Sequence, residues 1–292
     1  MVRITRLLVA AALITATSCV TAWAAPRGLA RQLPPSGVAP PGTIFRQVRI
    51  LDFTHLAGAT AIVFRYTPLA PGAAGQAEIV PAGAWLKIHG MFSSLPAASR
   101  LGPQDLTYTL WQVTPDGRTT NLGEIEVSGS NGEIHTKSRS HRFGLIVTAE
   151  PYFAVSQPSS ALAFESDAAP GSAVIPPLTQ VNCELLQAPI GSDVVAKITA
   201  DPKPGEPLLF EEARRALAVA RASGAAQYAP QTLDTAGQTL QIAEKLLAQH
   251  AKPADVHDAA LEAVLIAEDA RVLAVARQRR AQAARVVQDP AP

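Results

Sequence analysis

The hydrophobic periodicity of this chain changes once, close to Leu209, and this change constrains the fold more than any other feature. From about Ile44 to Ser166, apolar residues alternate with polar ones or run in blocks of strand length. Beyond Leu209 they step three and four residues apart, which is the spacing of one helix face. We therefore expect a β module followed by an α module, and 292 residues are enough for about two domains.

Several short strands with turn signals between them predict an antiparallel sheet. Leu106–Val113 and Thr119–Val127 flank the sequence TPDG, so they are expected to form a hairpin. Asn131-Gly132 is the strongest two-residue hairpin signal and predicts the next turn. Phe143–Glu150 is almost uniformly apolar, as a strand covered on both faces would be. This pattern predicts an Ig-like β-sandwich over residues 44–168.

Three helices are expected in the second module, over residues 208–223, 230–250 and 253–287. The two long helices are predicted to pair as an antiparallel, coiled-coil-like hairpin, because their apolar residues form heptad seams. The apolar surface of the third helix is wider than its seam and includes Leu261 and Val272. The first helix or a partner must cover that surface, so self-association through the helical region is one expectation.

The N-terminus predicts export. Arg3 and Arg6 precede a short apolar segment, and small residues before Ala25 suit cleavage between Ala24 and Ala25. The alternative is lipidation at Cys19, and a membrane is expected as a partner only in that case. We expect the periplasm or outer envelope of a Gram-negative-type bacterium. The full expected organisation is a signal peptide over 1–24, a Pro/Gly-rich linker over 25–43, the β-sandwich over 44–168, a second linker over 169–207 and the helical region over 208–288.

No motif in the sequence carries chemistry. The six histidines lie outside any metal-ligand spacing, and phosphate-binding glycine loops and nucleophile motifs are absent from the sequence. A net charge of +1 predicts no nucleic-acid partner. Catalytic residues, cofactors and metal ligands are therefore not expected, and the protein is not expected to be an enzyme. An enzyme would need a cleft where histidines and carboxylates converge.

Two groups of residues are candidates for binding. The arginines near the C-terminus would contact an anionic partner such as phosphate, a lipid headgroup or a cell-wall polymer, or they would only complement the helix dipole. Three aromatics of the β module would contact a glycan or another ligand, or they would belong to its core. The arginines are Arg277, Arg279, Arg280 and Arg285, and the aromatics are Trp85, Tyr152 and Phe153.

Two segments resemble known families. The sequences YTLWQVTPDGRTTNLGEIEV and FGLIVTAEPYFAVSQPSS resemble an uncharacterised exported β-domain of acidobacterial envelope proteins. The helical segment, with GAAQYAP and AEDARVLA, resembles a domain of unknown function in exported bacterial proteins and lipoproteins, where it often precedes an OmpA-like domain. No OmpA-like segment follows the helices in this chain, so peptidoglycan binding is not implied. Neither resemblance implies catalytic residues.

These observations lead to one main expectation and one alternative. The main expectation is an exported envelope protein with a non-enzymatic structural or interaction role and an envelope protein as its partner. The alternative is a glycan- or ligand-binding β-sandwich on a lipoprotein, with a cell-wall glycan as its ligand.

Overall fold

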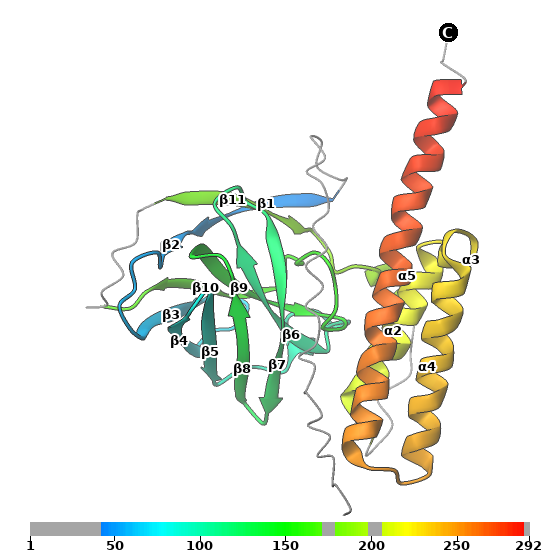
Figure 1. Ribbon diagram of the computed structural model, residues 1–292, viewed down its shortest axis with the longest axis horizontal. Helices are drawn as coiled ribbons and strands as arrows, with labels where there is room; N and C mark the ends of the chain where they lie inside the picture. Colours follow the sequence, from blue (N-terminus) through cyan, green and yellow to red (C-terminus); the bar gives the residue numbers. More distant parts are fainter. Residues whose placement is uncertain (1–41, 171–178, 198–205, 289–292) are drawn as a thin grey trace, which may run out of the picture.

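The computed structural model describes residues 42–170, 179–197 and 206–288. The predicted signal peptide, its cleavage point at Ala24 and Ala25, and Cys19 lie outside the described residues. Among the described helices, none combines the length and the apolar run that crossing a bilayer requires. The described chain forms a β region and a helical region that lie side by side (Figure 1).

Eight antiparallel strands form a closed barrel. Their order around it is β10-β3-β4-β5-β8-β7-β6-β9, and β9 pairs with β10 to complete the ring. The strands are β3 (Thr60–Tyr66), β4 (Ala74–Ala82), β5 (Trp85–Ser93), β6 (Thr107–Val113), β7 (Thr119–Ser128), β8 (Asn131–Ser138), β9 (Arg142–Glu150) and β10 (Leu162–Ala168). The predicted Ig-like sandwich is therefore wrong. Inward and outward residues alternate along the strands of a sandwich and of a barrel alike. The barrel is distinguished by strand β10, which pairs along both of its edges, with β9 and with β3.

The interior of the barrel is filled by apolar side chains. Phe64, Phe92 and Phe164 meet near its middle, with ring centroids 5.0 to 6.3 Å apart, in tilted and edge-on arrangements. Phe53 and Phe143 form a second aromatic pair at 4.8 Å. Leu110, Leu145, Val147 and other fully buried residues fill the space around these rings. The barrel wall thus encloses a packed core, as in other barrels of about eight strands.

Strands β6 and β9 are buried on both faces, as the apolar run Phe143–Glu150 predicted. In β6, Tyr108 and Leu110 face the barrel interior, whereas Trp111 and Val113 belong to a second core outside the wall. A two-stranded sheet of β1 (Thr43–Arg49) and β11 (Gln180–Leu186) contributes to this second core. The short strand β2 (Leu51–Asp52) pairs with the start of β9.

One expectation about the strands after Thr119 needs correction, the position of the turn between β7 and β8. The turn between β7 and β8 has Gly129 and Ser130 at its centre, because Ser128 pairs with Asn131. Gly129 has a φ of 63°, which suits that turn. The predicted turn glycine, Gly132, instead lies within β8, where an added Cβ would come within 2.7 Å of Ile125 and Leu95. The hairpin of β6 and β7 formed as predicted.

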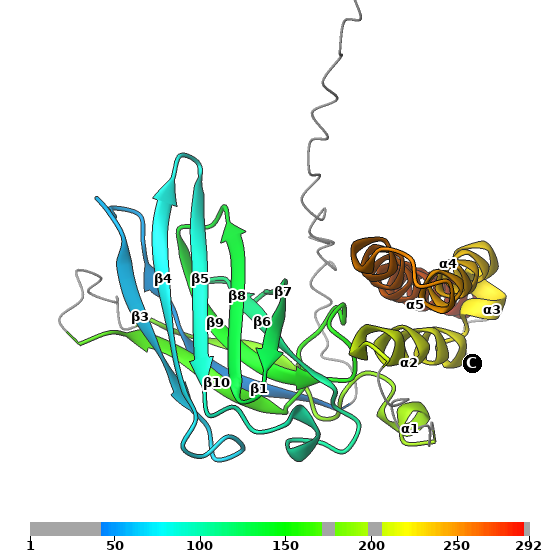
Figure 2. The ribbon, with the colours of Figure 1, turned by 90° about the horizontal axis from the view of Figure 1, so that it is seen from below.

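The helices lie close to their predicted ranges. They are α2 (Leu208–Ala222), α4 (Pro230–Ala248) and α5 (Pro253–Gln288), with short helices α1 (Ser192–Val195) and α3 (Ala225–Tyr228) and a 3-10 turn, η1 (Ala98–Arg100). The alanine-rich seam of α5 is buried from Val256 to Ala274, which allows the helix axes to approach closely. Helix α5 packs on both α4 and α2. Seen nearly end-on, the three helices gather on one side of the barrel (Figure 2).

One continuous apolar core joins the barrel to the helices. It contains Trp111 and Ile146 from the barrel wall, Phe210 from α2 and Val264 from α5. The apolar surface of α5 that extends beyond its seam was predicted to need cover from the first helix or from a partner. It is covered partly by α2 and partly by residues of the β region in the same core. Helix α5 alone continues past the other helices toward the C-terminus (Figure 1).

Candidate functional site

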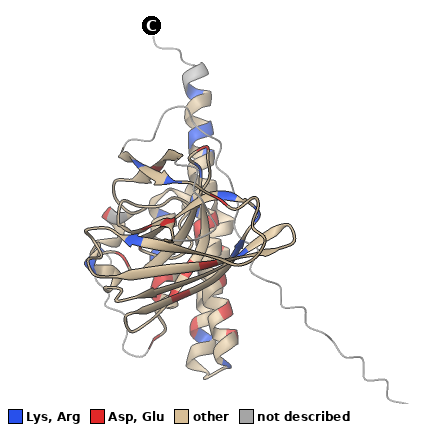
Figure 3. Cartoon of the chain, turned by 90° about the vertical axis from the view of Figure 1, so that its left-hand side faces the viewer, with Lys and Arg blue, Asp and Glu red and all other residues tan. Residues whose placement is uncertain are grey.

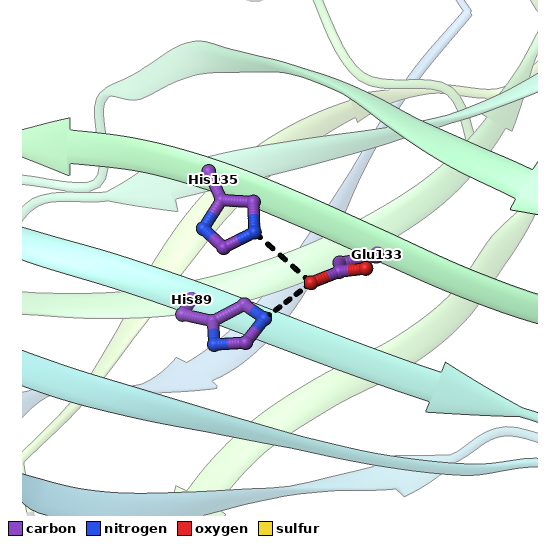
Figure 4. Close-up of side chains that lie close together, drawn as sticks. All are labelled: His89, Glu133 and His135. Carbon is purple, nitrogen blue, oxygen red and sulfur yellow. Dashed lines mark hydrogen bonds and ion pairs between the residues drawn. The ribbon is translucent and has the colours of Figure 1, made fainter.

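Three side chains on the outside of the barrel converge at neighbouring strands. Strands β5 and β8 are antiparallel neighbours, and their register sets His89 directly opposite His135. Both histidines point outward, because the residues flanking them in each strand point into the core. Glu133 precedes His135 by two residues and shares its face. We call His89, Glu133 and His135 the histidine cluster (Figure 4).

Both imidazoles are directed at the same carboxylate oxygen. The Nε2 atom of His89 lies 2.7 Å from Oε1 of Glu133, and Nε2 of His135 lies 3.0 Å from the same oxygen. The two rings stack with centroids 4.1 Å apart and planes 15° from parallel. Hydrogen bonds from His89 and then His135 lower the pKa of Glu133, so this carboxylate is ionised at neutral pH. Two nitrogens and one oxygen therefore meet at one point on the surface.

Charge is segregated along this face of the barrel. Toward one end, Lys137 and Arg139 lie over the ring of Trp85, at 4.7 and 4.4 Å from its centroid. Toward the other end, Glu126 pairs with Glu133 across β7 and β8. A shallow hollow of about 340 Å³ lies there and is lined by Glu124, Glu126, Glu133, Ile134 and His135. The histidine cluster stands between the basic and the acidic ends.

A second group of polar side chains is buried where the barrel meets the helices. We call Asp105, Glu150 and Glu212 the junction acids. All three are at most 1% exposed. Glu150 accepts hydrogen bonds through Oε1 from the backbone N–H of Ser159, at 2.7 Å, and from the hydroxyl of Thr148, at 2.5 Å.

Burial dominates the protonation of the junction acids. It raises the pKa of Glu150 to about 8 and that of Asp105 to about 7, although Arg215 opposes the shift at Asp105. Burial also raises the pKa of Glu212, and the nearby charge of Glu124 adds to that effect. Glu150 is therefore mostly neutral at pH 7, and Asp105 is close to half-protonated. Neutral acids reduce the cost of burying these groups at the junction.

Hydrogen bonds tie the loop after β9 to helix α5. The hydroxyl of Tyr152 donates to Oε2 of Glu268 at 2.8 Å. Arg271 donates to both oxygens of Glu268 at 2.7 Å and to the hydroxyl of Ser156 at 2.7 Å. On helix α2, Arg215 donates to the backbone carbonyl of Gln104 in the barrel. These bonds fix the helices on the barrel wall.

The three aromatic candidates have different surroundings. Tyr152 is fully buried and Phe153 is 8% exposed, and both lie in the core between barrel and helices. Trp85 lies on the outer face of β5, where two cations contact its ring. Tyr152 and Phe153 are thus packing residues in this structure, and Trp85 alone of the three shares the outer face of β5 with His89.

The four arginine candidates lie in the last twelve residues of α5, near its C-terminal end. Basic residues mark this end in Figure 3. All four are exposed, and residues 277–288 contain no acidic residue. Arg277 donates to the backbone carbonyl of Tyr228. The other three arginines make no ion pair with any residue in the described part of the chain.

Sequence reasoning missed the histidine cluster. His89 and His135 lie far apart in the chain and form no linear motif. Their meeting depends on β5 pairing with β8 across the intervening β6–β7 hairpin, and on one exact register. Alternation in the segment Trp85–Phe92 predicts that His89 shares a strand face with Trp85, and the sequence carries no further signal for the cluster.

Comparison of the chain with protein-family models, with curated proteins and with solved structures gave no match. The class of protein is therefore described by its architecture: a filled eight-stranded antiparallel barrel, joined to a helical bundle with a projecting basic helix end.

Proposed function

We propose that this chain is an exported, non-enzymatic interaction protein of the cell envelope that binds an acidic polymer through the projecting end of α5. One observation carries the proposal: four exposed arginines lie near the end of α5, where Arg277 donates to the backbone carbonyl of Tyr228 and the helix continues past the other helices. The barrel and the bundle serve as the rigid platform for this end. The predicted signal peptide supports the location.

The directions of the arginines favour a polymer over a flat surface. Each residue of an α-helix is rotated by about 100° around the axis from the one before it. Measured from Arg277, the rotation is about 200° for Arg279, about 300° for Arg280 and about 80° for Arg285. Basic side chains thus surround this helix end. An amphipathic helix that lies on a bilayer gathers its charges on one face instead. A flexible chain with carboxylate or phosphate groups can reach charges on all sides.

Complementing the helix dipole does not account for all four arginines. The dipole acts within about the last turn of a helix. Helix α5 ends at Gln288, so Arg277, Arg279 and Arg280 lie more than one turn before its end. Unpaired arginines in a stretch without acids suit bidentate contacts to anionic groups. The observations favour this role over the glycan-binding alternative, since Tyr152 and Phe153 are buried.

Binding to an acidic polysaccharide tests the proposal. We expect the protein to bind polygalacturonate at low salt, with an affinity that falls as salt rises. The triple variant Arg279→Gln, Arg280→Gln, Arg285→Gln should lose at least about tenfold in affinity, since each lost charged contact is worth roughly 1 kcal/mol or more. Biolayer interferometry with the immobilised polymer measures this.

The matched control removes the same charge from other exposed positions, Arg100→Gln, Lys245→Gln and Lys252→Gln. Equal losses in both triple variants would reduce the effect to net charge and overturn the proposal. Tighter binding to vesicles containing an anionic phospholipid than to the polymer would assign the arginines to a membrane instead.

Sequencing the N-terminus of the protein made in its own host tests the location. We expect the mature chain to begin at Ala25 and to appear in the soluble envelope fraction. A lipidated start at Cys19 would instead place it on a membrane. A mature chain that still begins at Met1 would contradict export.

A further inference from the structure

We propose that the histidine cluster is a binding site for a divalent transition-metal ion, with Zn²⁺ as the representative ion. The ligands are Nε2 of His89, Nε2 of His135 and a carboxylate oxygen of Glu133. The inference is independent of the polymer-binding proposal, because it uses different residues on a different module.

The ligand types and their spacing suit this ion. Imidazole nitrogen and carboxylate oxygen both bind Zn²⁺ at about 2.0–2.2 Å, which places two ligands of a tetrahedral ion roughly 3.3–3.5 Å apart. The candidate ligand atoms all lie within 4.8 Å of one another, and the two imidazoles approach Oε1 of Glu133 at 2.7 and 3.0 Å. The two nitrogen–oxygen distances are somewhat shorter than the separation that a tetrahedral ion requires. Side-chain rotation alone can therefore bring the three atoms to their places around an ion.

The backbone holds the ligands in register. Strands β5 and β8 pair over seven consecutive residues, from Leu86 opposite Ser138 to Phe92 opposite Gly132. Each strand also has a second neighbour, β4 for β5 and β7 for β8, so neither lies at a free edge. Ligands on adjacent positions of a closed barrel wall need little reorganisation on binding, because the wall is already ordered.

The site leaves room for a further ligand. Three protein ligands complete only part of a tetrahedron, and the fourth position stays open to water or to a group of another molecule. The hollow beside Glu133 and His135 adjoins this position, and Glu126 adds a second carboxylate next to it. The negative charge of both carboxylates attracts a cation to this place. It favours a metal site over the alternative interpretation, in which the three side chains only form hydrogen bonds with one another on the surface.

Direct titration tests the proposal on the full chain without a polyhistidine tag. We expect isothermal titration with Zn²⁺ to give one equivalent bound, and Co²⁺ to give d–d absorption bands of a low-coordinate site. His89→Gln and Glu133→Gln should each weaken Zn²⁺ binding by more than about tenfold, since even an outer-shell partner of a metal ligand is worth about 10–100-fold. The double variant His89→Gln, His135→Gln should abolish it.

His257→Gln is the matched control, because His257 is exposed on α5, away from the barrel wall. It should bind Zn²⁺ as the unaltered chain does. Circular dichroism confirms that each variant is folded, which is expected because the altered side chains lie on the surface. Binding that persists unchanged in the double variant, or absence of binding in the unaltered chain, would overturn the proposal.

Discussion

At the scale of single residues, the junction acids are the least usual feature of the molecule. Glu150 is fully buried between the barrel and the helices, and its Oε2 atom has no hydrogen-bond partner. An ionised carboxylate in such a place would be costly, and the group stays protonated instead. Unfolding then releases a proton that the folded state holds. Stability must therefore depend on pH in a particular direction.

The free energy of unfolding should fall as pH rises. The pKa of Glu150 is raised from 4.5 to about 8 in the folded state. Between these two pH values the folded chain thus binds more protons than the unfolded chain. The contribution of Glu150 to the free energy of unfolding is therefore fully present below pH 4.5, and it is lost as the pH rises through about 8. Glu150→Gln mimics the neutral acid. In this variant the free energy of unfolding should therefore fall by roughly 1–3 kcal/mol less over this rise in pH than in the unaltered chain.

Urea unfolding at about pH 6 and pH 9 measures the effect. The control is Glu126→Gln, which makes the same substitution at an exposed position and should leave the pH dependence of stability as it is. The pKa of Asp105 is raised to about 7, so this residue makes the free energy of unfolding fall with pH in the same direction, over a lower pH range, in both variants. If Glu150→Gln and the unaltered chain lose stability in parallel, the proton is not held at Glu150.

At the scale of elements, the sequence predicted best where the signal was local. The helix ranges followed from heptad stepping, and the structure starts α4 at Pro230 and α5 at Pro253. The burial of β9 followed from its uniform apolar composition. The turn between β7 and β8 was misplaced, because two glycines lie close together and only Gly129 has the positive φ. Strand β8 is polar on its outer face alone, and it lies inside the ring between β5 and β7.

Close packing between elements gives a prediction for Gly144 in β9. A Cβ at this position would lie 2.3 Å from the backbone oxygen of Arg49 and 2.7 Å from Cγ1 of Val48, where the chain of β1 crosses the strand. Gly144→Ala should therefore lower the free energy of unfolding by about 1–3 kcal/mol through overpacking.

Gly58→Ala is the matched control, because nothing lies within 4 Å of an added Cβ there. It should change stability by less than about 0.5 kcal/mol in chemical denaturation. Equal effects of the two substitutions would show that β1 can move away from β9 without cost.

At the scale of the whole molecule, the sequence could not decide between a sandwich and a barrel. Closure rests on two pairings of β10: Phe164 opposite Tyr66 of β3 and Phe164 opposite Val147 of β9. The second pairing includes a change of register between Leu162 and Phe164, which no alternation pattern reveals. The candidate metal site was hidden for the same reason, because its ligands meet only through a long-range register. The basic end of α5 was visible from composition alone.

Closure of the ring by its last strand also sets the order in which the chain can assemble. Until residue 168 is available, β3 and β9 are open sheet edges, and exposed edges are templates for pairing with other chains. Even after closure, the second core outside the wall, which includes Trp111 and Ile146, stays incomplete until α2 arrives, some forty residues later in the chain. A partly made chain is therefore most prone to aggregate in this interval. We therefore expect helix α2 to limit aggregation of the new chain by completing the core against the barrel wall.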